Sequence, residues 1–415
     1  SVLIVRYLGM EDYGQYTALY LIPILFASLG SLGFGPSIVY HIGRGNFDLR
    51  KYLYSYTLLG AILGFTIYMI FALLANYINL YIYDNRLDLN LFFISLLFIP
   101  IVIIQKYVRA ILRGIYEVKL FSFLLDLAIP IIRVITVLMV IFLDLELIGI
   151  VITPVIVQGI IALYIFFYLI KVSSYSDQSR LIDFSHFIDM SKFALKSFLG
   201  TFLQKSNSTI VNIIASSLLT FSELSILSLA QKLLAIISNV SNSLLTVLMP
   251  KVSKSSLSEI VKFIPKSTSI LFTFNILFLT FYLLFVEILV TFLYGPEFKD
   301  IAEISIPLGI ASIFLPLCNI LLLSITFTGD PIKKTYARGG GFAVNLLSLF
   351  YLYNLYGLLG LGISIALGQI VIFILSLIFF RMKFKDVNLK NLFILKIDNL
   401  IELKKALSHI FDKKR

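Results

Sequence analysis

Five ionisable side chains interrupt otherwise apolar stretches of this 415-residue sequence: Asp126, Arg133, Lys205, Lys232 and Glu287. A charge inside an apolar segment is costly unless it faces water, a partner or a ligand, so each is a candidate site residue. The cations could hold a desolvated anion such as a phosphate, and the carboxylates could carry a proton or a sodium ion. The chemistry that this set indicates is therefore ion binding rather than catalysis.

Arg133 lies near the middle of its predicted span, in the segment DLAIPIIRVIT, and Asp126 precedes it by seven residues. In a helix this spacing is two turns and places both side chains on one face. Two interpretations stay open. The pair could be an ion pair that only orients the helix, or Asp126 could carry the coupling ion, H⁺ or Na⁺, while Arg133 binds a substrate anion.

Lys205 stands in the polar run FLQKSNSTIVN, together with Gln204 and Asn207. Such a run cannot face lipid on every side, so we expect it to line a water-filled cavity; a polar contact between helices is the alternative. Lys232 could be a ligand or could extend outward to the membrane surface. Glu287 is a second ion-coupling candidate, although it lies near a helix end where water could reach it.

The elements that must position these residues are membrane-spanning helices. Hydrophobic residues make up 59% of the chain, charged residues 14%, and the mean hydropathy is +0.97, far from the range of soluble domains. The apolar runs are long enough to cross about 30 Å of hydrocarbon as helices. We predict an all-α, multi-pass membrane protein with twelve transmembrane helices, the first truncated to residues 1–9. The other spans are predicted at 14–43, 52–78, 90–113, 119–143, 147–170, 192–219, 223–250, 266–294, 301–328, 333–356 and 358–381.

The distribution of the cations predicts which way the helices cross. Alternate loops, the central linker and the C-terminal tail hold 28 of the 34 Lys and Arg residues. The opposite loops hold only Arg6, Arg86 and Lys299, among ten acidic residues. By the positive-inside rule, the basic loops and the C-terminus are cytoplasmic. The formal charge of +11 is thus a sign of membrane topology and does not indicate nucleic-acid binding.

A faint internal repeat predicts two lobes. RGIYEVKLF followed by LIGIVI in the first half corresponds to TGDPIKKTY followed by GLGISIA in the second, with paired glycines 35 and 33 residues apart. We expect two six-helix lobes related by a pseudo-twofold axis along the membrane normal. The N-terminal lobe spans 1–170, a cytoplasmic linker 171–191, the C-terminal lobe 192–381, and a basic tail 382–415 that should form an interfacial helix.

Signs of catalysis or of a resident cofactor are missing from the sequence. The three histidines have no metal-ligand spacing, and no Walker lysine occurs, so we predict neither a metal, a cofactor nor an enzyme. The glycines of GRGN at Gly43 and of RGGG at Arg338 are interpreted as loop residues, too weak a signal for phosphate sites. Cys318 is expected to be a small buried hydrophobe.

Three stretches resemble one family. They are VRYLGMEDYGQYTALY, SILSLAQKLLAIISNVSNSLLTVLMPKVSK, and YGPEFKDIAEISIPLGIASIF with the segment TGDPIKKTYARGGGFAVNLLSLFYLYNLYGLLGLGISIALGQI. In order and spacing they are similar to the Wzx-like polysaccharide flippases of the multidrug/oligosaccharidyl-lipid/polysaccharide (MOP) exporter superfamily. Arg6 matches the arginine of that family's R-x-L-G segment. Asn207 departs from it, because many relatives carry an acid there, which puts ion coupling at that position in doubt.

The resemblance implies a function. It implies a flippase of the prokaryotic cell membrane that moves an oligosaccharide linked to polyprenyl diphosphate from the cytoplasmic to the outer leaflet by alternating access. The product would serve assembly of O-antigen, capsule or exopolysaccharide, with glycosyltransferases or a polymerase of the same pathway as partners. Arg6, Arg133, Lys205, Lys232, Gln204 and Asn207 would bind the substrate. The alternatives are a drug, cation or other lipid exporter of the same superfamily, and a membrane polysaccharide polymerase.

Overall fold

The computed structural model describes residues 2–42, 49–173, 191, 194–195, 198, 202, 209–254, 257–327, 330–385 and 387–393. These residues form helices and turns, and no strand occurs among them. Seven of the described helices are long and apolar enough to cross a membrane. The protein is therefore an all-α, multi-pass membrane protein, as the sequence predicts.

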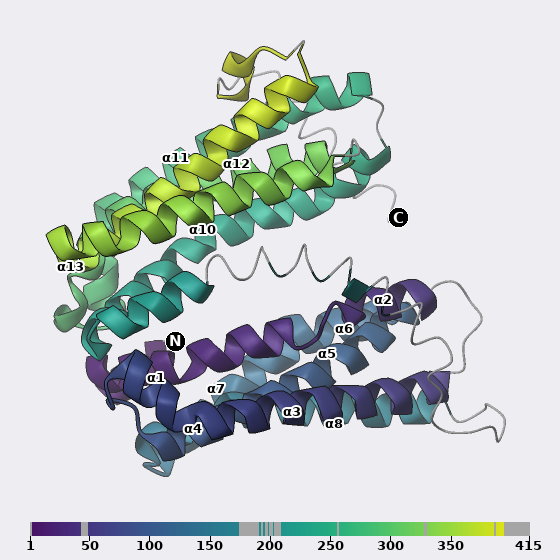
Figure 1. Cartoon of the computed structure of the whole chain (residues 1–415), viewed down its shortest axis with the longest axis vertical. Helices are drawn as coiled ribbons and strands as arrows, with labels where there is room; N and C mark the ends of the chain where they lie inside the picture. Colours follow the sequence, from purple (N-terminus) through teal and green to yellow (C-terminus); the bar gives the residue numbers. More distant parts are fainter. Residues whose placement is uncertain are drawn as a thin grey trace. The chain divides into compact units, whose positions relative to one another are not determined.

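The chain divides into two compact units, Ser1–Ser225 and Ile226–Arg415 (Figure 1). The helices of the first unit are α1 (Val2–Leu29), α2 (Phe34–Ile42), α3 (Leu49–Tyr83), α4 (Leu89–Leu96), α5 (Phe98–Gly114), α6 (Val118–Phe123), the π turn η1 (Leu124–Ala128), α7 (Ile129–Phe142) and α8 (Glu146–Val172). A further helix of this unit is Thr209–Leu218. The predicted lobe boundaries and the axis between the lobes stay predictions.

The second unit is built from four long helices and two short turns. Its helices are α10 (Phe221–Lys254), which begins in the first unit, α11 (Leu257–Leu293), α12 (Ile301–Phe327) and α13 (Pro331–Lys383), with 3-10 turns η2 (Pro296–Phe298) and η3 (Leu389–Leu392). The side chain of Phe393, just after η3, packs its ring 5.2 Å from that of Phe272 on α11. The remainder of the predicted interfacial helix lies outside the described residues.

Helix α13 is two antiparallel arms joined at Gly357. The backbone there has φ 55° and ψ −132°, a left-handed conformation that glycine adopts without strain. Lys383, at the end of the second arm, comes back to within 2.9 Å of Asp330, which precedes the first arm. The arms correspond to the predicted spans 333–356 and 358–381, and Figure 1 shows them side by side in green and yellow.

The two arms of α13 cross where both carry glycine. A Cβ atom added at Gly341 would lie 2.2 Å from Cγ1 of Ile372 and 2.6 Å from the carbonyl oxygen of Gly368. A Cβ atom at Gly368 would lie 2.8 Å from the carbonyl oxygen of Gly341. Small residues at such crossings let helix backbones approach closely in membranes. The loop interpretation of RGGG is therefore wrong: these glycines are helical, and at least Gly341 serves packing.

Burial follows the predicted repeat. In α3, the third span of the first predicted lobe, 17% of the most apolar 18-residue stretch is buried. In Ile264–Leu293, the third span of the second predicted lobe, the buried share of the corresponding stretch is 22%. In Leu89–Gly114 and Ile301–Thr326, the fourth spans, the values are 61% and 67%. Each unit thus has a central fourth helix and a third helix whose apolar side chains face outward, as expected for a surface solvated by lipid.

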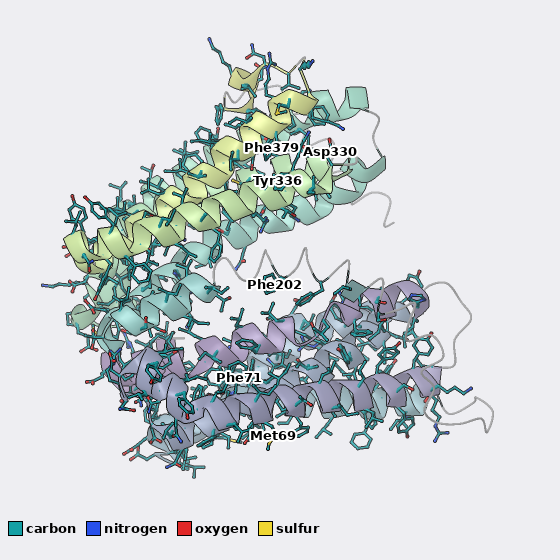
Figure 2. The ribbon with its side chains drawn as sticks, viewed as in Figure 1. Met69, Phe71, Phe202, Asp330, Tyr336 and Phe379 are labelled. Carbon is teal, nitrogen blue, oxygen red and sulfur yellow. The ribbon has the colours of Figure 1, made fainter. Side chains whose placement is uncertain are left out.

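Helix α3 has one face that packs against the protein and one apolar face that is exposed. Met69 is 55% exposed, whereas Phe71, two residues later on the opposite face, packs its ring 4.2 Å from that of Phe26 on α1 (Figure 2). The exposed face continues through Ile62, Phe65 and Leu73. An apolar face of this kind requires a hydrocarbon solvent, so α3 lies at the lipid boundary of its unit.

Loops predicted to lie on the same side of the membrane contact each other. Tyr7 donates its hydroxyl hydrogen to Oδ1 of Asp144 over 3.0 Å, and Nη1 of Arg86 donates to the carbonyl oxygen of Leu219 over 2.9 Å. All four residues belong to predicted outer loops or outer helix ends. Within the first unit, the predicted alternation of sides therefore agrees with the helix packing.

Three predicted spans contain breaks that periodicity did not reveal, one of them at Leu97, where the span 90–113 divides into α4 and α5. The expected span 14–43 is divided between α1 and α2 by a turn in which Leu32 (φ 45°) and Gly33 (φ 74°) are left-handed. The expected span 119–143 contains the π turn η1 (Leu124–Ala128), which widens the helix by one residue. Each break lies within one apolar run, so hydropathy alone merges the pieces.

Candidate functional site

Arg133 lies on an exposed part of α7 and is held by an aromatic row on α1. Its Nη2 donates a hydrogen bond to the hydroxyl oxygen of Tyr16 over 3.3 Å. The Tyr16 ring stands 6.0 Å from that of Tyr13 and 5.2 Å from that of Tyr20. Tyr20 in turn donates its hydroxyl hydrogen to the carbonyl oxygen of Val151 on α8.

The aromatic row is a support for the arginine. Tyr13 is 1% exposed and Tyr16 7%, so their ring faces are covered by the protein. The guanidinium of Arg133 is exposed and uses one of its five N–H donors in the contact with Tyr16. This arrangement leaves a positioned cation with donors to spare, which suits a phosphate or another anion.

Asp126 does not pair with Arg133 in the described part of the chain. It lies exposed within the π turn η1, and no ion pair or hydrogen bond joins the two side chains. The π turn makes the helix rotate less per residue, which turns Asp126 away from the face expected for seven residues of regular α-helix. The ion-pair interpretation therefore finds no contact to support it, and ion coupling by Asp126 stays a prediction.

The remaining predicted site residues that the structure describes lie on three different helices. Arg6 is exposed on α1, Lys232 is exposed on α10, and Glu287 is exposed on α11. Gln204, Lys205 and Asn207 lie outside the described residues. The substrate and coupling roles of all these residues remain predictions.

Sequence reasoning missed half-buried arginines inside each unit, of which Arg109 and Arg338 each bond to a side-chain amide of a neighbouring helix. Nη2 of Arg109 on α5 donates to Oε1 of Gln158 on α8 over 3.3 Å, and Nη2 of Arg338 on α13 donates to Oδ1 of Asn319 on α12 over 3.0 Å. In both arginines the Nε atom is buried and has no hydrogen-bond partner. The cation count groups both with the loop residues, although both also lie inside the predicted spans 90–113 and 333–356.

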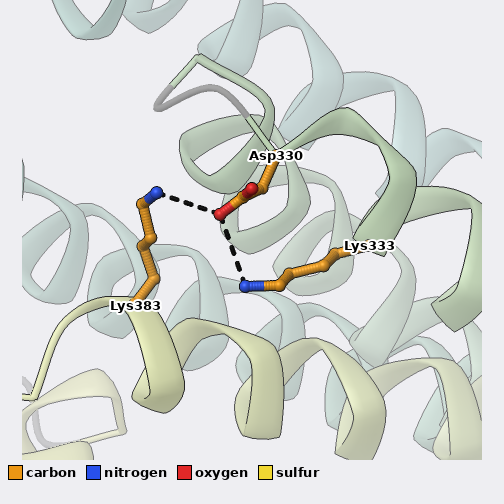
Figure 3. Close-up of polar contacts among 3 residues, drawn as sticks. All are labelled: Asp330, Lys333 and Lys383. Carbon is orange, nitrogen blue, oxygen red and sulfur yellow. Dashed lines mark hydrogen bonds and ion pairs between the residues drawn. The ribbon is translucent and has the colours of Figure 1, made fainter.

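A carboxylate joins the two ends of α13. Oδ2 of Asp330 lies 2.9 Å from Nζ of Lys383 and 3.3 Å from Nζ of Lys333 (Figure 3). These contacts, led by the hydrogen bond from Lys383, hold the pKa of the Asp330 carboxyl below its ordinary value. These ion pairs hold together the predicted cytoplasmic ends of the two arms. They also engage Asp330, the carboxylate nearest in sequence to Lys334 and Arg338.

Comparison with known families assigns the chain. Residues 1–256, more than half of its length, match the family model described as polysaccharide biosynthesis protein. The protein belongs to the polysaccharide biosynthesis protein family. The match includes Arg6, Asp126, Arg133 and Lys232, so most of the predicted site residues fall within the part of the chain that defines the family. A comparison with curated proteins returns no match.

Solved structures with the same fold are transporters. One is the lipid II flippase MurJ in an inward closed conformation, with a TM-score of 0.75 and 17% identity over 98% of this chain and 89% of that one. Another is an inward-facing multidrug resistance MATE family transporter of the MOP superfamily, with a TM-score of 0.75 and 16% identity over 92% of this chain and 93% of that one. This family member therefore has the fold of MOP-superfamily transporters and is an integral membrane protein.

Proposed function

We propose that the protein is a flippase that moves an oligosaccharide linked to polyprenyl diphosphate from the cytoplasmic to the outer leaflet of a prokaryotic cell membrane. The observation that supports this proposal is the combination of a polysaccharide-biosynthesis family sequence with the fold of a lipid II flippase. Glycosyltransferases or a polymerase of the same pathway would supply and consume the substrate. The transported lipid would serve assembly of O-antigen, capsule or exopolysaccharide.

The exposed arginine supports an anionic substrate. A diphosphate that leaves water needs charged donors in its place, because desolvating an unpaired anion costs many kcal/mol. Arg133 offers such donors from a fixed position beside Tyr16. Arg6 and Lys232 are exposed on their own units and would add charge, and Lys205 with Gln204 and Asn207 would complete the site.

Direction would come from alternating access. The two predicted lobes would expose the site first to the cytoplasm and then to the outside, while the prenyl chain stays in lipid. A ligand or gradient drives such a change only through different affinity for the two states. Coupling to H⁺ or Na⁺ through Asp126 or Glu287 would supply that difference, and so would removal of product outside.

Deletion and complementation test the proposal. Cells without the protein should accumulate the lipid-linked oligosaccharide, seen by mass spectrometry of extracted lipids, and should lose surface glycan. The wild-type gene should restore both, and Arg133→Gln should restore them poorly at equal protein level. Tyr16→Phe is the matched control, because it removes the hydrogen bond but leaves the charge.

The fold is shared with a multidrug transporter, so the same experiment must separate the alternatives. An exporter of drugs or cations predicts that the deletion changes drug sensitivity and that no lipid-linked intermediate accumulates. A polymerase predicts that single repeat units accumulate on the outer leaflet, where an added glycosidase can reach them. Either result would overturn the flippase proposal.

A further inference from the structure

The guanidinium of Arg338 in the second unit has a buried donor without a hydrogen-bond partner. It lies half-buried on the first arm of α13 and donates one hydrogen bond, from Nη2 to Oδ1 of Asn319. Its Nε atom is buried without a partner. A guanidinium has five N–H donors, and burying donors that remain unpaired costs free energy. The contact with Asn319 therefore satisfies only part of this group.

A second cation stands beside Arg338. Lys334 lies one helical turn earlier on the same face of α13 and is also half-buried. Among the residues that the structure describes, no carboxylate pairs with either side chain. The nearest candidate, Asp330, is engaged by Lys333 and Lys383 (Figure 3). Among the described residues, these two adjacent half-buried cations, which repel each other, are thus left without a counter-ion.

The depth of this pair in the helix matches a lipid headgroup. Arg338 follows the first residue of α13, Pro331, by seven residues, which is about 10 Å at 1.5 Å per residue. The positive-inside rule places this end of α13 on the cytoplasmic side. A cation pair one to two turns inside a helix end lies near the boundary between headgroups and hydrocarbon, where basic pockets between helices hold lipid phosphates.

The first unit repeats the arrangement on other helices. Arg109 and Arg113 are one turn apart on α5, Arg109 donates to Oε1 of Gln158, and its Nε atom is buried without a partner. In both units a half-buried arginine is bonded to a side-chain amide of a neighbouring helix and has a second cation one turn away. The recurrence argues that the arrangement at Arg338 is not accidental.

We infer that Lys334, Arg338 and Asn319 form a binding site for a phosphate group, and that its occupant is the headgroup of an anionic membrane lipid. Arg338 and Lys334 supply the charge, and Asn319 fixes the guanidinium. This site lies within one unit and is distinct from the exposed residues assigned to the transported substrate. It does not depend on the proposed function, so either can fail alone.

Lipid-dependent thermal unfolding tests the site. The purified full-length chain is heated in mixed micelles with phosphatidylglycerol or with phosphatidylcholine, and a thiol-reactive dye reports the exposure of Cys318, which is 1% exposed when folded. Phosphatidylglycerol should raise the unfolding midpoint by about 3 °C more than phosphatidylcholine at a tenfold excess over its dissociation constant. Arg338→Met should lose at least half of that difference, and so should Lys334→Gln.

The controls decide between specific and general charge effects. Lys333→Gln removes a neighbouring cation that is already paired with Asp330. This variant should show the same difference in unfolding midpoint between the two lipids as the wild type. If inorganic phosphate or pyrophosphate without lipid gives the same Arg338-dependent shift, the site is supported and a soluble phosphate compound is its occupant. The proposal would be overturned if both lipids raised the wild-type unfolding midpoint equally. It would also be overturned if Lys334→Gln and Arg338→Lys kept the whole wild-type difference in midpoint between the two lipids. These two mild variants serve if Arg338→Met does not fold.

Discussion

Adding one methyl group should affect the stability of the protein differently at Gly339 and at Gly341, which stand two residues apart on α13. A Cβ atom at Gly341 would lie 2.2 Å from Cγ1 of Ile372 and 2.6 Å from the backbone oxygen of Gly368. A Cβ atom at Gly339 would meet nothing within 4 Å. Both residues are helical, so alanine would improve the intrinsic helix propensity of each to the same extent. The two substitutions therefore differ only in the contact with the second arm.

The contact sets the size of the effect. A carbon–oxygen distance of 2.6 Å is far below van der Waals contact, and the oxygen belongs to the backbone of the opposite arm, so the arms must move apart. Overpacking of this kind costs about 1–3 kcal/mol, while the gain in helix propensity is about 1 kcal/mol for either glycine. We expect Gly341→Ala to be less stable than Gly339→Ala by about 2 kcal/mol, or roughly 2 °C in the unfolding midpoint of a chain of this length.

The unfolding midpoint is measured with the thiol-reactive dye on Cys318, the single cysteine of the chain, whose side chain is buried beside α13. Gly339→Ala serves as the matched control and should melt at or slightly above the wild-type temperature. Equal midpoints for the two variants would refute the argument, because they would mean that the arms do not cross closely at Gly341.

Three further outcomes follow from other contacts. Arg133→Gln should lower the rate of lipid flipping in proteoliposomes about ten- to a hundredfold without changing the unfolding midpoint, because its guanidinium is exposed; a change in the midpoint alone would contradict this. Asn79→Ala should cost about 2–4 kcal/mol in thermal unfolding, because the side chain both donates to and accepts from the backbone of Leu87 over 3.0 Å; a cost within experimental error would contradict this. Asp330→Asn should lower the midpoint at neutral pH. The pKa of Asp330 is lowered on folding by Lys383 and Lys333. The carboxylate therefore stabilises the folded state above the unfolded pKa of about 3.9, and this stabilisation is lost as the pH falls through the folded pKa. The unfolding midpoints of wild type and variant should therefore converge in acid.

Hydropathy and charge predicted the helices well because the bilayer imposes one period and one length on all of them. The spans 52–78 and 301–328 appear as α3 (Leu49–Tyr83) and α12 (Ile301–Phe327), with ends shifted by a few residues. The turn between the last two spans falls at Gly357, where the sequence leaves one residue between them. What hydropathy could not show is the π turn at Leu124–Ala128, because a single charged residue, Asp126, among Leu and Ala does not distinguish a π turn from a regular helix.

The site was harder to predict because contacts between helices decide it. Periodicity placed Asp126 and Arg133 on one face, but the π turn between them and the hydroxyl of Tyr16 on another helix determine where Arg133 is held. Charge counting assigned Arg109 and Arg338 to loops. Each is half-buried instead, because a side-chain amide on a neighbouring helix accepts a hydrogen bond from it. No feature of a single segment carries that information.

The cations thus separate into two classes with different expected roles. Arg109 and Arg338 each bond to a residue of their own unit, so these contacts can persist if the two units move against each other as rigid bodies. Arg6, Arg133 and Lys232 are exposed on their units, so their surroundings can change with such a movement. A transporter gains direction only from interactions that differ between its states. We therefore expect substitutions of the exposed class to change transport with little effect on stability, and those of the half-buried class to change stability and its dependence on lipid first. Measuring both properties on Arg133→Gln and Arg338→Met tests the division, and a reversal of the two patterns would show that the half-buried arginines handle the substrate.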